Sequence, residues 1–429
     1  MEYTETTSTS WFSRLGSSFG GVLIGVLLLV GGTVLLWWNE GDFVKTRDAI
    51  NEAWKVAVEL PQVGHIDPSF DGKLVHAVAL ADTKEILHDP VFGVGNRAIA
   101  LKRNVEFYQW VEDSRTETKQ KLGGGEEQVT TYTYNAKWVS RPVDSQRFHA
   151  PYARTQHVNR VLLNIDDQEI QAKHVSFGAY HLPNFLISAI GGAQPFQPNL
   201  TPAVYDKITL DILRAQPQIG ATYGNSYGTN SWQGFPSQGQ MPNYAQLPRS
   251  QWPRVVHEQG SVLYLGANPS TPAIGDMRIT FELTPSATVS VLARVKSNSF
   301  EPFHASNGKE VSGLSMGQVS MEAMFASKHS GNETMTWVFR LLGTVLVMSG
   351  FGLLLNPLKV IASVIPFLGS IVGVGTGLVS FLLGLAWSLI VISIAWLRFR
   401  PVTGAIMVGV AVVLLILLHV KGRNQQAAA

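Results

Sequence analysis

The chain contains no cysteine, which excludes disulfides, thiolate nucleophiles and zinc sites built on cysteine. Charge is also scarce, because only 15% of the 429 residues are Asp, Glu, Lys or Arg, against about 25% in an ordinary soluble domain. No acidic residue follows Glu333. The formal net charge of +2 is too small to attract nucleic acid over a distance. We therefore expect no nucleic-acid partner and turn to the apolar residues, which make up 45% of the chain.

Long apolar runs predict helices that cross a lipid bilayer, so membrane lipids are expected partners. A helical crossing needs about 20 apolar residues. Trp37 and Trp38 end the first run with an aromatic pair typical of the headgroup level. This run is longer than the apolar region of a signal peptide, and no cleavage site follows it. The four predicted crossings are residues 20–38, 337–355, 367–397 and 402–420.

The other segments near the membrane follow from these crossings. Residues 1–19 and 421–429 form the two tails. The segment 357–366, bounded by prolines, is predicted to lie along the membrane interface. Arg340, close to one end of its crossing, is expected to extend to the lipid headgroups.

Residues 39–336 have ordinary polarity and are predicted to form a β-rich soluble domain. Residues 129–139 alternate aromatic and polar side chains with a period of two, which is typical of a half-buried strand. Residues 46–58 have helical spacing instead. Further strands are expected at residues 73–80, 98–102, 104–112, 260–265, 276–283 and 288–295, with a loop at 114–128. The predicted fold class is membrane α-helical, with four transmembrane helices, plus a large β-rich α+β soluble domain inserted between helix 1 and helix 2.

A segment of unusual composition interrupts this domain at residues 216–252. It is rich in Gly, Gln, Asn, Ser, Tyr and Pro and has few aliphatic residues. Such a composition buries little apolar surface, so we predict a long Gly/Gln/Tyr-rich loop on the surface. The alternative is a tyrosine-bearing contact loop used in self-association.

One motif suggests hydrolase chemistry, but its surroundings do not fit. Residues 313–317 match G-x-S-x-G, in which a strained turn exposes a serine nucleophile, here Ser315. No buried strand is predicted before it, and a short helix is expected at 315–325. We therefore predict no catalytic residue and expect that the chain is not an enzyme.

Metal and cofactor signals are equally weak. The histidines of the soluble part show neither i, i+4 pairing nor an H-E-x-x-H arrangement. These histidines are His76, His88, His149, His157, His174 and His181. Asp166, Asp167 and Glu169 lack the spacing of a calcium loop, which favours a solvated turn. No phosphate-binding or dinucleotide-binding motif occurs, so no metal and no cofactor is predicted.

Three blocks of sequence, in chain order, resemble one known family. The first includes Asp89 and Pro90 and continues into a strand; the second is residues 275–278 and the third is residues 396–401. The strand residues of the first block are Glu106, Tyr108, Gln109 and Trp110. These blocks are similar to the signature of the transmembrane protein 43 family, also called Luma, and they extend over almost the whole chain.

This resemblance implies a multi-pass protein with one N-terminal crossing, a large lumenal or extracytoplasmic domain and three C-terminal crossings. It does not imply an enzyme. We expect a bacterial member, located in the inner membrane. Eukaryotic members reside in the endoplasmic reticulum and the inner nuclear membrane, where they self-associate and organise membrane proteins.

The longest apolar segment suggests how the crossings assemble. Small residues at four-residue spacing let helix backbones approach closely in lipid. The small residues of this segment predicted to pack are Gly369, Gly373, Gly377, Ser380 and Gly384. No ionisable residue lies between Val360 and Leu397, and this lack of buried charge argues against a pump.

We therefore expect a non-enzymatic membrane scaffold that forms a homo-oligomer through its glycine-striped helices. Its β-rich domain would bind other membrane proteins, whose identity the sequence does not give. The alternative is a channel or transport subunit with an uncharged pore that forms in the oligomer.

Overall fold

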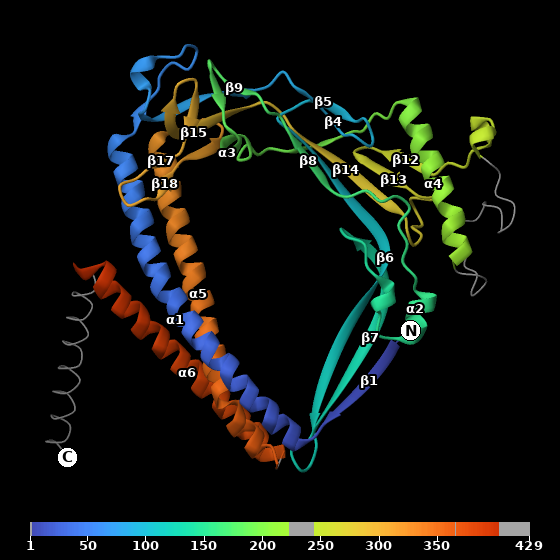
Figure 1. Cartoon of the computed structure of the whole chain (residues 1–429), viewed down its shortest axis with the longest axis vertical. Helices are drawn as coiled ribbons and strands as arrows, with labels where there is room; N and C mark the ends of the chain where they lie inside the picture. Colours follow the sequence, from blue (N-terminus) through green and yellow to red (C-terminus); the bar gives the residue numbers. More distant parts are fainter. Residues whose placement is uncertain (1, 223–243, 365, 403–429) are drawn as a thin grey trace, which may run out of the picture.

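The computed structural model describes residues 2–222, 244–364 and 366–402. Long helices lie on one side of the molecule, a β-rich domain lies across the top, and a narrow β-ribbon descends on the other side (Figure 1). The ribbon meets the helices again at the bottom of the view. The described chain therefore has the outline of a closed frame.

Among the described residues, three helices are long and apolar enough to cross a membrane. They are α1 (Trp11–Val56), α5 (Met321–Ala362) and α6 (Pro366–Phe399). They contain the predicted crossings 20–38, 337–355 and 367–397. The fourth predicted crossing, 402–420, lies almost entirely outside the described residues, as does the tail 421–429.

Helix α1 is longer than its predicted crossing and continues into the soluble domain. The side chain of Ser10 accepts a hydrogen bond from the backbone N–H of Ser13 and caps its start. We predicted a separate helix at 46–58, but α1 runs without a break to Val56. The apolar run and the amphipathic stretch therefore belong to a single element.

Helix α5 also corrects the predicted boundaries. It begins at Met321, where Ser320 caps it, and it continues through Pro357 to Ala362. A proline is tolerated inside a membrane helix when neighbouring groups satisfy the freed backbone. The expected interfacial segment 357–366 is thus divided between the end of α5, a turn and the start of α6.

Glycines set the close approach of α1 and α5. A Cβ atom built on Gly25 would lie 2.9 Å from the carbonyl oxygen of Gly350, and one on Gly32 would lie 2.9 Å from that of Gly343. A methyl group fits at neither position without moving a helix. This is the small-residue packing typical of membrane helices.

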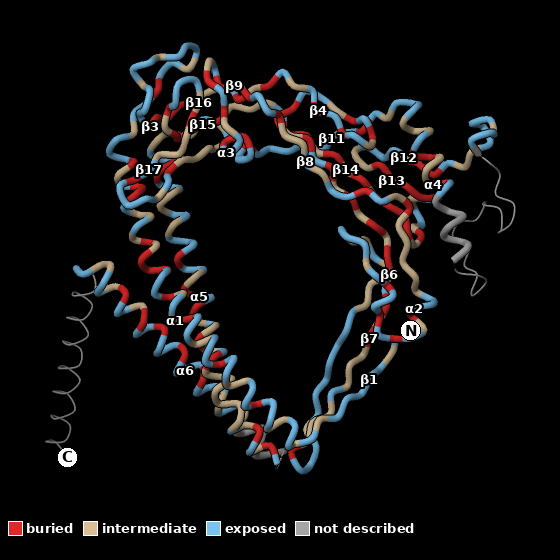
Figure 2. Tube along the Cα trace, viewed as in Figure 1, coloured by how far each residue is buried: buried red, intermediate tan, exposed pale blue. Residues whose placement is uncertain are grey.

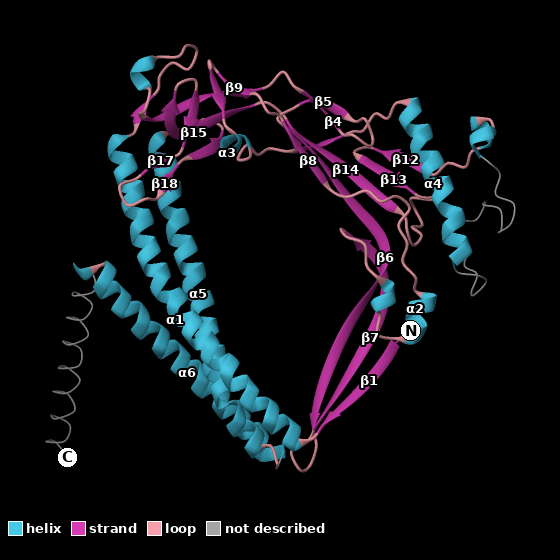
Figure 3. Ribbon diagram, viewed as in Figure 1, coloured by secondary structure: helices cyan, strands magenta, loops and turns pink. Residues whose placement is uncertain are grey.

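The larger sheet has eight strands, all paired antiparallel, and includes the ribbon (Figure 3). Its order is β1-β7-β6-β14-β13-β12, with β11 beside β14 and β8 beside β6. The bounds are β1 Glu2–Thr9, β6 Ala100–Gln120, β7 Glu126–Val139, β8 Gln168–Gln171, β11 Gln194–Phe196, β12 Val256–Gln259, β13 Val262–Leu265 and β14 Met277–Thr284.

The second sheet has seven strands in the order β10-β9-β3-β15-β16, with β19 beside β15 and β2 beside β3. The bounds are β2 Val58–Glu59, β3 Leu74–Asp82, β9 Val175–Phe177, β10 Tyr180–Leu182, β15 Ala287–Lys296, β16 Ser299–Glu301 and β19 Gly313–Met316. Two small hairpins are β4 (Ile86–His88) with β5 (Gly95–Arg97), and β17 (Phe303–His304) with β18 (Glu310–Val311). The shorter helices are α2 Pro151–Gln156, α3 Asn184–Ile187 and α4 Pro202–Thr222, and α4 takes up the first residues of the predicted loop 216–252.

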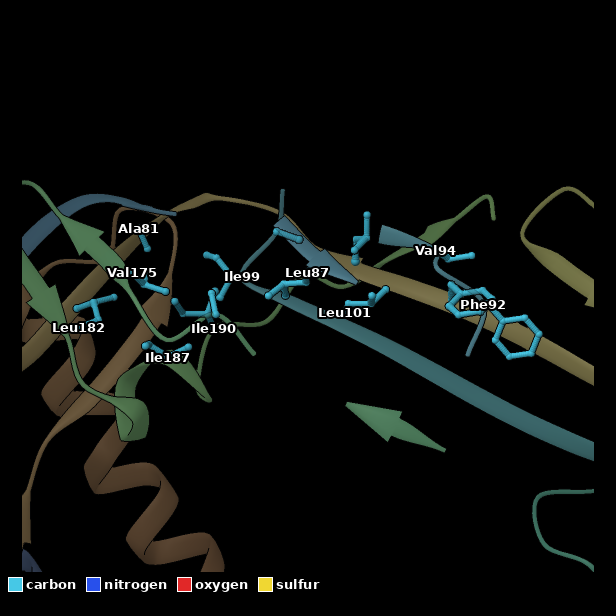
Figure 4. Close-up of a cluster of buried hydrophobic side chains, with 14 of the residues drawn as sticks. Ala81, Leu87, Phe92, Val94, Ile99, Leu101, Val175, Leu182, Ile187 and Ile190 are labelled. Carbon is cyan, nitrogen blue, oxygen red and sulfur yellow. The ribbon is translucent and has the colours of Figure 1, made fainter. Parts of the chain in front are cut away.

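Buried apolar side chains of both sheets form one continuous core (Figure 4). Val175 and Leu182 come from the second sheet, and Leu101 comes from the larger one. A smaller cluster, which includes Ile50 of α1 and Phe325 of α5, attaches the helices to this domain. The upper end of the helix pair is therefore fixed to the second sheet.

The ribbon is longer than the sequence predicts. Strands expected at 98–102 and 104–112 form one continuous strand, β6, and β7 begins at Glu126. The expected loop 114–128 is thus mostly strand, with only residues 121–125 left as the turn. No glycine or proline interrupts the polar, threonine-rich sequence before Gly123, so pairing continues to that point.

Candidate functional site at the ends of the membrane helices

A buried cluster of charges joins the three membrane helices at the end of α6 and within α1 and α5, toward the soluble domain. Glu40 of α1 is fully buried and accepts two hydrogen bonds from the guanidinium of Arg340 in α5, at 2.6 and 2.9 Å. The indole N–H of Trp396 in α6 donates to the same carboxylate at 2.8 Å. Arg400 lies 3.6 Å from it and stacks over the ring of Phe43. One carboxylate therefore organises side chains from all three helices.

This cluster corrects one expectation and qualifies another. Arg340 does not extend to the lipid headgroups, because its side chain is buried against Glu40 and lies over the ring of Trp337. The segment between Val360 and Leu397 does lack ionisable residues, but the helices α1 and α5 beside it hold a buried ion pair. Removing one member of a buried ion pair leaves an uncompensated charge in a medium of low dielectric constant. The triad Glu40, Arg340 and Trp396 is therefore a strong constraint on how the helices pack.

At the opposite end of the helices, the turn of the β-ribbon is docked on α1 and α5. Arg14 of α1 pairs with Glu126 of the ribbon at 2.9 Å and donates to the carbonyl oxygen of Gly124 at 2.6 Å. The backbone N–H of Gly123 donates to the carbonyl oxygen of Val364, just after α5. The indole of Trp11 donates to the carbonyl oxygen of Val360. The ribbon turn thus contacts the ends of both helices.

The predicted packing residues of α6 do not share one environment. Ser380 is buried, and a Cβ atom on Gly384 would lie 2.7 Å from the Cα atom of Met348 in α5. A Cβ atom on Gly377 would meet no described atom within 4 Å, and one on Gly373 would meet only the side chain of Lys359.

Gly369 lies in the first turns of α6, where side-chain surroundings are not described. Part of the stripe therefore packs within the chain, whereas Gly377 is open among the described residues.

The family-signature residues lie in the soluble domain, far along the chain from the membrane helices. Asp89 is buried, pairs with Arg103 at 2.5 Å and accepts the backbone N–H groups of Val91 and Phe92. Pro90 follows it in an exposed turn. These contacts hold the β4–β5 hairpin against β6.

The signature strand β6 forms a second set of contacts. The amide of Gln109 is buried, donates to the carbonyl oxygen of Arg160 and accepts the backbone N–H of Val143. Glu106 pairs with Arg278 at 2.7 Å. The backbone of Trp110 exchanges two hydrogen bonds with the side chain of Asn159.

Tyr108 bonds through its backbone to the 275–276 segment of the second signature block. The signature residues therefore tie the base of the ribbon to the rest of the domain.

Asp276 has a carboxyl group whose pKa is raised by its surroundings. It is fully buried and accepts hydrogen bonds from Tyr264 and from the backbone N–H of Ala273, while its Oδ1 atom has no partner in the described structure. Burial raises the pKa of Asp276 to about 6, although the nearby Arg160 guanidinium opposes this effect. Burial and the adjacent carboxylate also raise the pKa of Tyr264.

The G-x-S-x-G segment is a strand rather than a nucleophile turn. Residues 313–316 form β19, in which Ser315 pairs with Ser290 of β15. The helix expected at 315–325 begins only at Met321. The backbone of a sheet edge therefore fixes Ser315.

Within the described ranges, no three His, Asp or Glu side chains are grouped so that they would bind a metal ion.

These features define a membrane protein with several membrane-spanning helices and one large β-rich domain. The chain belongs to the transmembrane protein 43 family, whose model, described as "Transmembrane protein 43", matches residues 107–401.

Animal proteins of this name are similar over nearly the full length. The chain is 24% identical to Transmembrane protein 43 of Homo sapiens, over 95% of this chain and 92% of that protein. It is 25% identical to the Transmembrane protein 43 homolog of Drosophila melanogaster, over 89% of this chain and 90% of that protein. Because these relatives are eukaryotic, the comparisons do not support the expected bacterial origin. No solved structure matches the chain.

Proposed function

We propose that the chain is a non-enzymatic, multi-pass membrane scaffold that self-associates through α6 and binds other membrane proteins through its β-rich domain. The observation that supports self-association most directly is a face of α6 that no other described residue covers. Val374, Leu378 and Phe381 are exposed around Gly377, while Ser380 and Gly384 face α5. An apolar helix face with a glycine at its centre lets a second helix approach closely in lipid.

Replacing Gly377 with leucine tests this proposal. The Gly377→Leu variant should lower the oligomer size measured by light scattering in nanodiscs, because the larger side chain keeps a second helix away. Gly31→Leu on α1 is the matched control, since a Cβ atom there also meets nothing within 4 Å. An unchanged oligomer in Gly377→Leu would contradict assembly through this face.

Partner binding by the β-rich domain is tested by purification in native lipid. Membrane proteins that co-purify with the full chain should be lost from a variant that carries changes on the exposed surface of this domain, while the oligomer size stays constant. If the same membrane proteins co-purify with the surface variant, the β-rich domain does not bind them through this surface.

We infer that the domain lies on the lumenal or extracytoplasmic side, in the endoplasmic reticulum or inner nuclear membrane of a eukaryote or in the inner membrane of a bacterium. Exposed His65 of the domain offers the test, because the chain has no natural cysteine. A His65→Cys variant in intact, sealed vesicles of known sidedness should react with an impermeant maleimide only from the lumenal side.

A non-enzymatic role requires that Ser315 does not act as a nucleophile. The full chain should fail to react with a fluorophosphonate probe, because Ser315 is held in a strand. Labelling that disappears in Ser315→Ala would establish a hydrolase instead.

The second candidate function is a channel or transport subunit whose pore forms in the oligomer. The polar β-ribbon, which runs from the soluble domain to the far ends of the helices, favours this reading over a plain anchor (Figure 1). Ion flux into proteoliposomes that contain the full chain tests it. Absence of flux for both cations and anions would remove the channel from consideration.

A further inference from the structure

The lower part of the β-ribbon descends opposite the membrane-spanning helices and meets them at the bottom of the frame (Figure 1). Its turn is docked on Arg14 and Val364, at the ends of α1 and α5 that are farthest from the soluble domain. At 1.5 Å per residue, about 39 Å of helix separates Arg14 from Glu40 at the other end. On the opposite side of the frame, the ribbon runs from the soluble domain down to the same ends of the helices (Figures 1 and 3).

The length of the paired strands fits the thickness of a bilayer. β1 pairs with β7 over eight residues, from Glu2 to Thr9, which corresponds to about 26 Å of strand. The hydrocarbon core of a bilayer is about 30 Å thick. A membrane crossed by α1 and α5 therefore lies at the level of this ribbon.

The surface of this ribbon is polar on both faces. We call the segments 2–9, 113–120 and 126–133 the lower ribbon; they read EYTETTST, DSRTETKQ and EEQVTTYT. Residues 113–119 of β6 are all exposed, and successive side chains of a strand point to opposite faces (Figure 2). The residues of β1 are exposed as well, except for Tyr3 and Thr9, which are partly buried. Lipid is thus an unsuitable neighbour for either face.

The two edges of the lower ribbon raise the same difficulty. β1 and the distal part of β6 are its outer strands, and no further described strand pairs with them there. Unpaired backbone N–H and C=O groups do not occur against lipid, where only helices and closed barrels span. An isolated ribbon without an apolar face is also marginally stable in water. Both arguments call for a partner along these edges.

We propose that the lower ribbon crosses the level of the bilayer within an assembly of several copies of this chain, where β1 of one copy lies against β6 of the next. The helices then face the lipid, and the polar ribbons face one another and enclosed water. This proposal rests on the self-association proposed above, but assigns it to a second surface.

Charge and strand pairing favour a second copy as the partner. The charged side chains of the β1 edge, Glu2 and Glu5, are both acidic. The distal β6 edge carries two acidic and two basic side chains, Asp113, Arg115, Glu117 and Lys119. Opposite charges across neighbouring strands stabilise a sheet. Each copy presents both edges, so side-by-side copies place the acidic β1 edge next to an edge that offers Arg115 and Lys119.

The first test asks on which side of the membrane the ribbon turn lies. Leu122 in the turn is highly exposed, and the chain lacks cysteine, so a single Leu122→Cys variant is a clean reporter. An impermeant maleimide should label it from the same side of sealed vesicles as Ser17→Cys, near the start of α1, and not from the side of His65→Cys. Labelling from the His65 side would overturn the proposal.

The second test asks whether the edges of different copies meet. Within one copy, Thr4 and Arg115 are separated by β7, hence by about 10 Å, beyond the reach of a disulfide. Mild oxidation of a Thr4→Cys/Arg115→Cys variant in vesicles should therefore give a ladder of covalent multimers. The single variants should give no species larger than a dimer.

Failure of this inference is distinguishable from failure of the proposed function. If the double cysteine variant stays monomeric on denaturing gels while light scattering still shows an oligomer, the ribbon edges do not meet and self-association stands. If Gly377→Leu leaves the oligomer intact and the ladder forms, assembly occurs through the ribbon and not through α6.

Discussion

At the residue scale, the two buried carboxylates Glu40 and Asp276 differ in how well their neighbours compensate them. Glu40 is matched by Arg340 and by the indole of Trp396, so its charge is compensated. Asp276 is buried with two hydrogen-bond donors on one oxygen and none on the other among the described residues. The first carboxylate has a counter-charge beside it, whereas burial raises the pKa of the second.

Asp276 should therefore make the stability of the domain depend on pH. Its folded pKa of about 6 exceeds the ordinary value of 3.8, so the folded state binds the proton more tightly than the unfolded state. The free energy of unfolding should fall as pH rises from about 4 to about 6, by about 3 kcal/mol for a shift of this size. Thermal unfolding between pH 4 and 7 measures it.

The Asp276→Asn variant should lose this component of the pH dependence and be at least as stable at pH 7. Asp89→Asn is the control, because Asp89 is a buried carboxylate paired with Arg103. It should destabilise the domain at pH 7, since a buried Arg103 would lose its counter-charge. A pH profile of Asp276→Asn identical to that of the natural chain would contradict the assignment.

The ion pair of Glu40 should be essential to helix packing. Arg340→Met should lower the free energy of unfolding by about 3–5 kcal/mol, because Glu40 would keep a poorly compensated charge in the interior. Arg47→Met removes an arginine from an exposed pair with Asp48 on the same group of helices and should cost about 0–1 kcal/mol. Thermal unfolding in detergent compares the two, and equal losses would contradict the role of the buried pair.

At the scale of elements, helices and strands were predictable from the sequence where their apolar residues recur with a regular period. Segments 20–38, 129–139 and 367–397 have an uninterrupted pattern, and each lies within a single helix or strand of that type. The segments 2–9 and 113–120 of the lower ribbon have no apolar period, because nearly all of their side chains are polar. For that reason they were predicted to lie in the tail 1–19 and, for the most part, in the loop 114–128.

The site at the helix ends was predictable only in part. Arg340 stands out in the sequence as a charge near one end of an apolar run, but nothing in a single sequence indicates that Glu40, three hundred positions earlier, is its partner. Such pairing depends on the alignment of α1 and α5, which glycines on both helices determine. The available signal was the polar pair Asn39 and Glu40, which follows an apolar run that ends in Trp37 and Trp38.

The crossing of α1 and α5 should be intolerant of one added methyl group. A Cβ atom on Gly32 would lie 2.8 Å from the side chain of Val347 and 2.9 Å from the carbonyl oxygen of Gly343, whereas one on the adjacent Gly31 would meet nothing within 4 Å. Gly32→Ala should lower the unfolding temperature in detergent because the helices must separate. Gly31→Ala should leave it unchanged or raise it slightly, since alanine favours the helix. Equal effects would contradict the close crossing.

At the scale of the whole molecule, two attachments turn an elongated chain into a frame. The upper one is apolar and lies between α1, α5 and the second sheet. The lower one is polar and lies between Arg14 and the ribbon turn. Because β1 directly precedes α1 and pairs along β7, opening the lower attachment should also loosen the first strand.

Reversing the charge at this lower attachment should open the frame, and a double exchange should partly close it again. Arg14→Glu places two acidic side chains together where Arg14 and Glu126 now pair at 2.9 Å with little exposure. Hydrogen exchange of the β1 amides should then accelerate, because strand pairing near the turn loses its anchor. Glu126→Arg should have the same effect. The combined Arg14→Glu/Glu126→Arg variant should recover part of the protection, since the ion pair is restored while the hydrogen bond from Arg14 to Gly124 is not. Unaltered exchange in both single variants would show that the ribbon is held in place by other contacts, and the closed frame would then not depend on this pair.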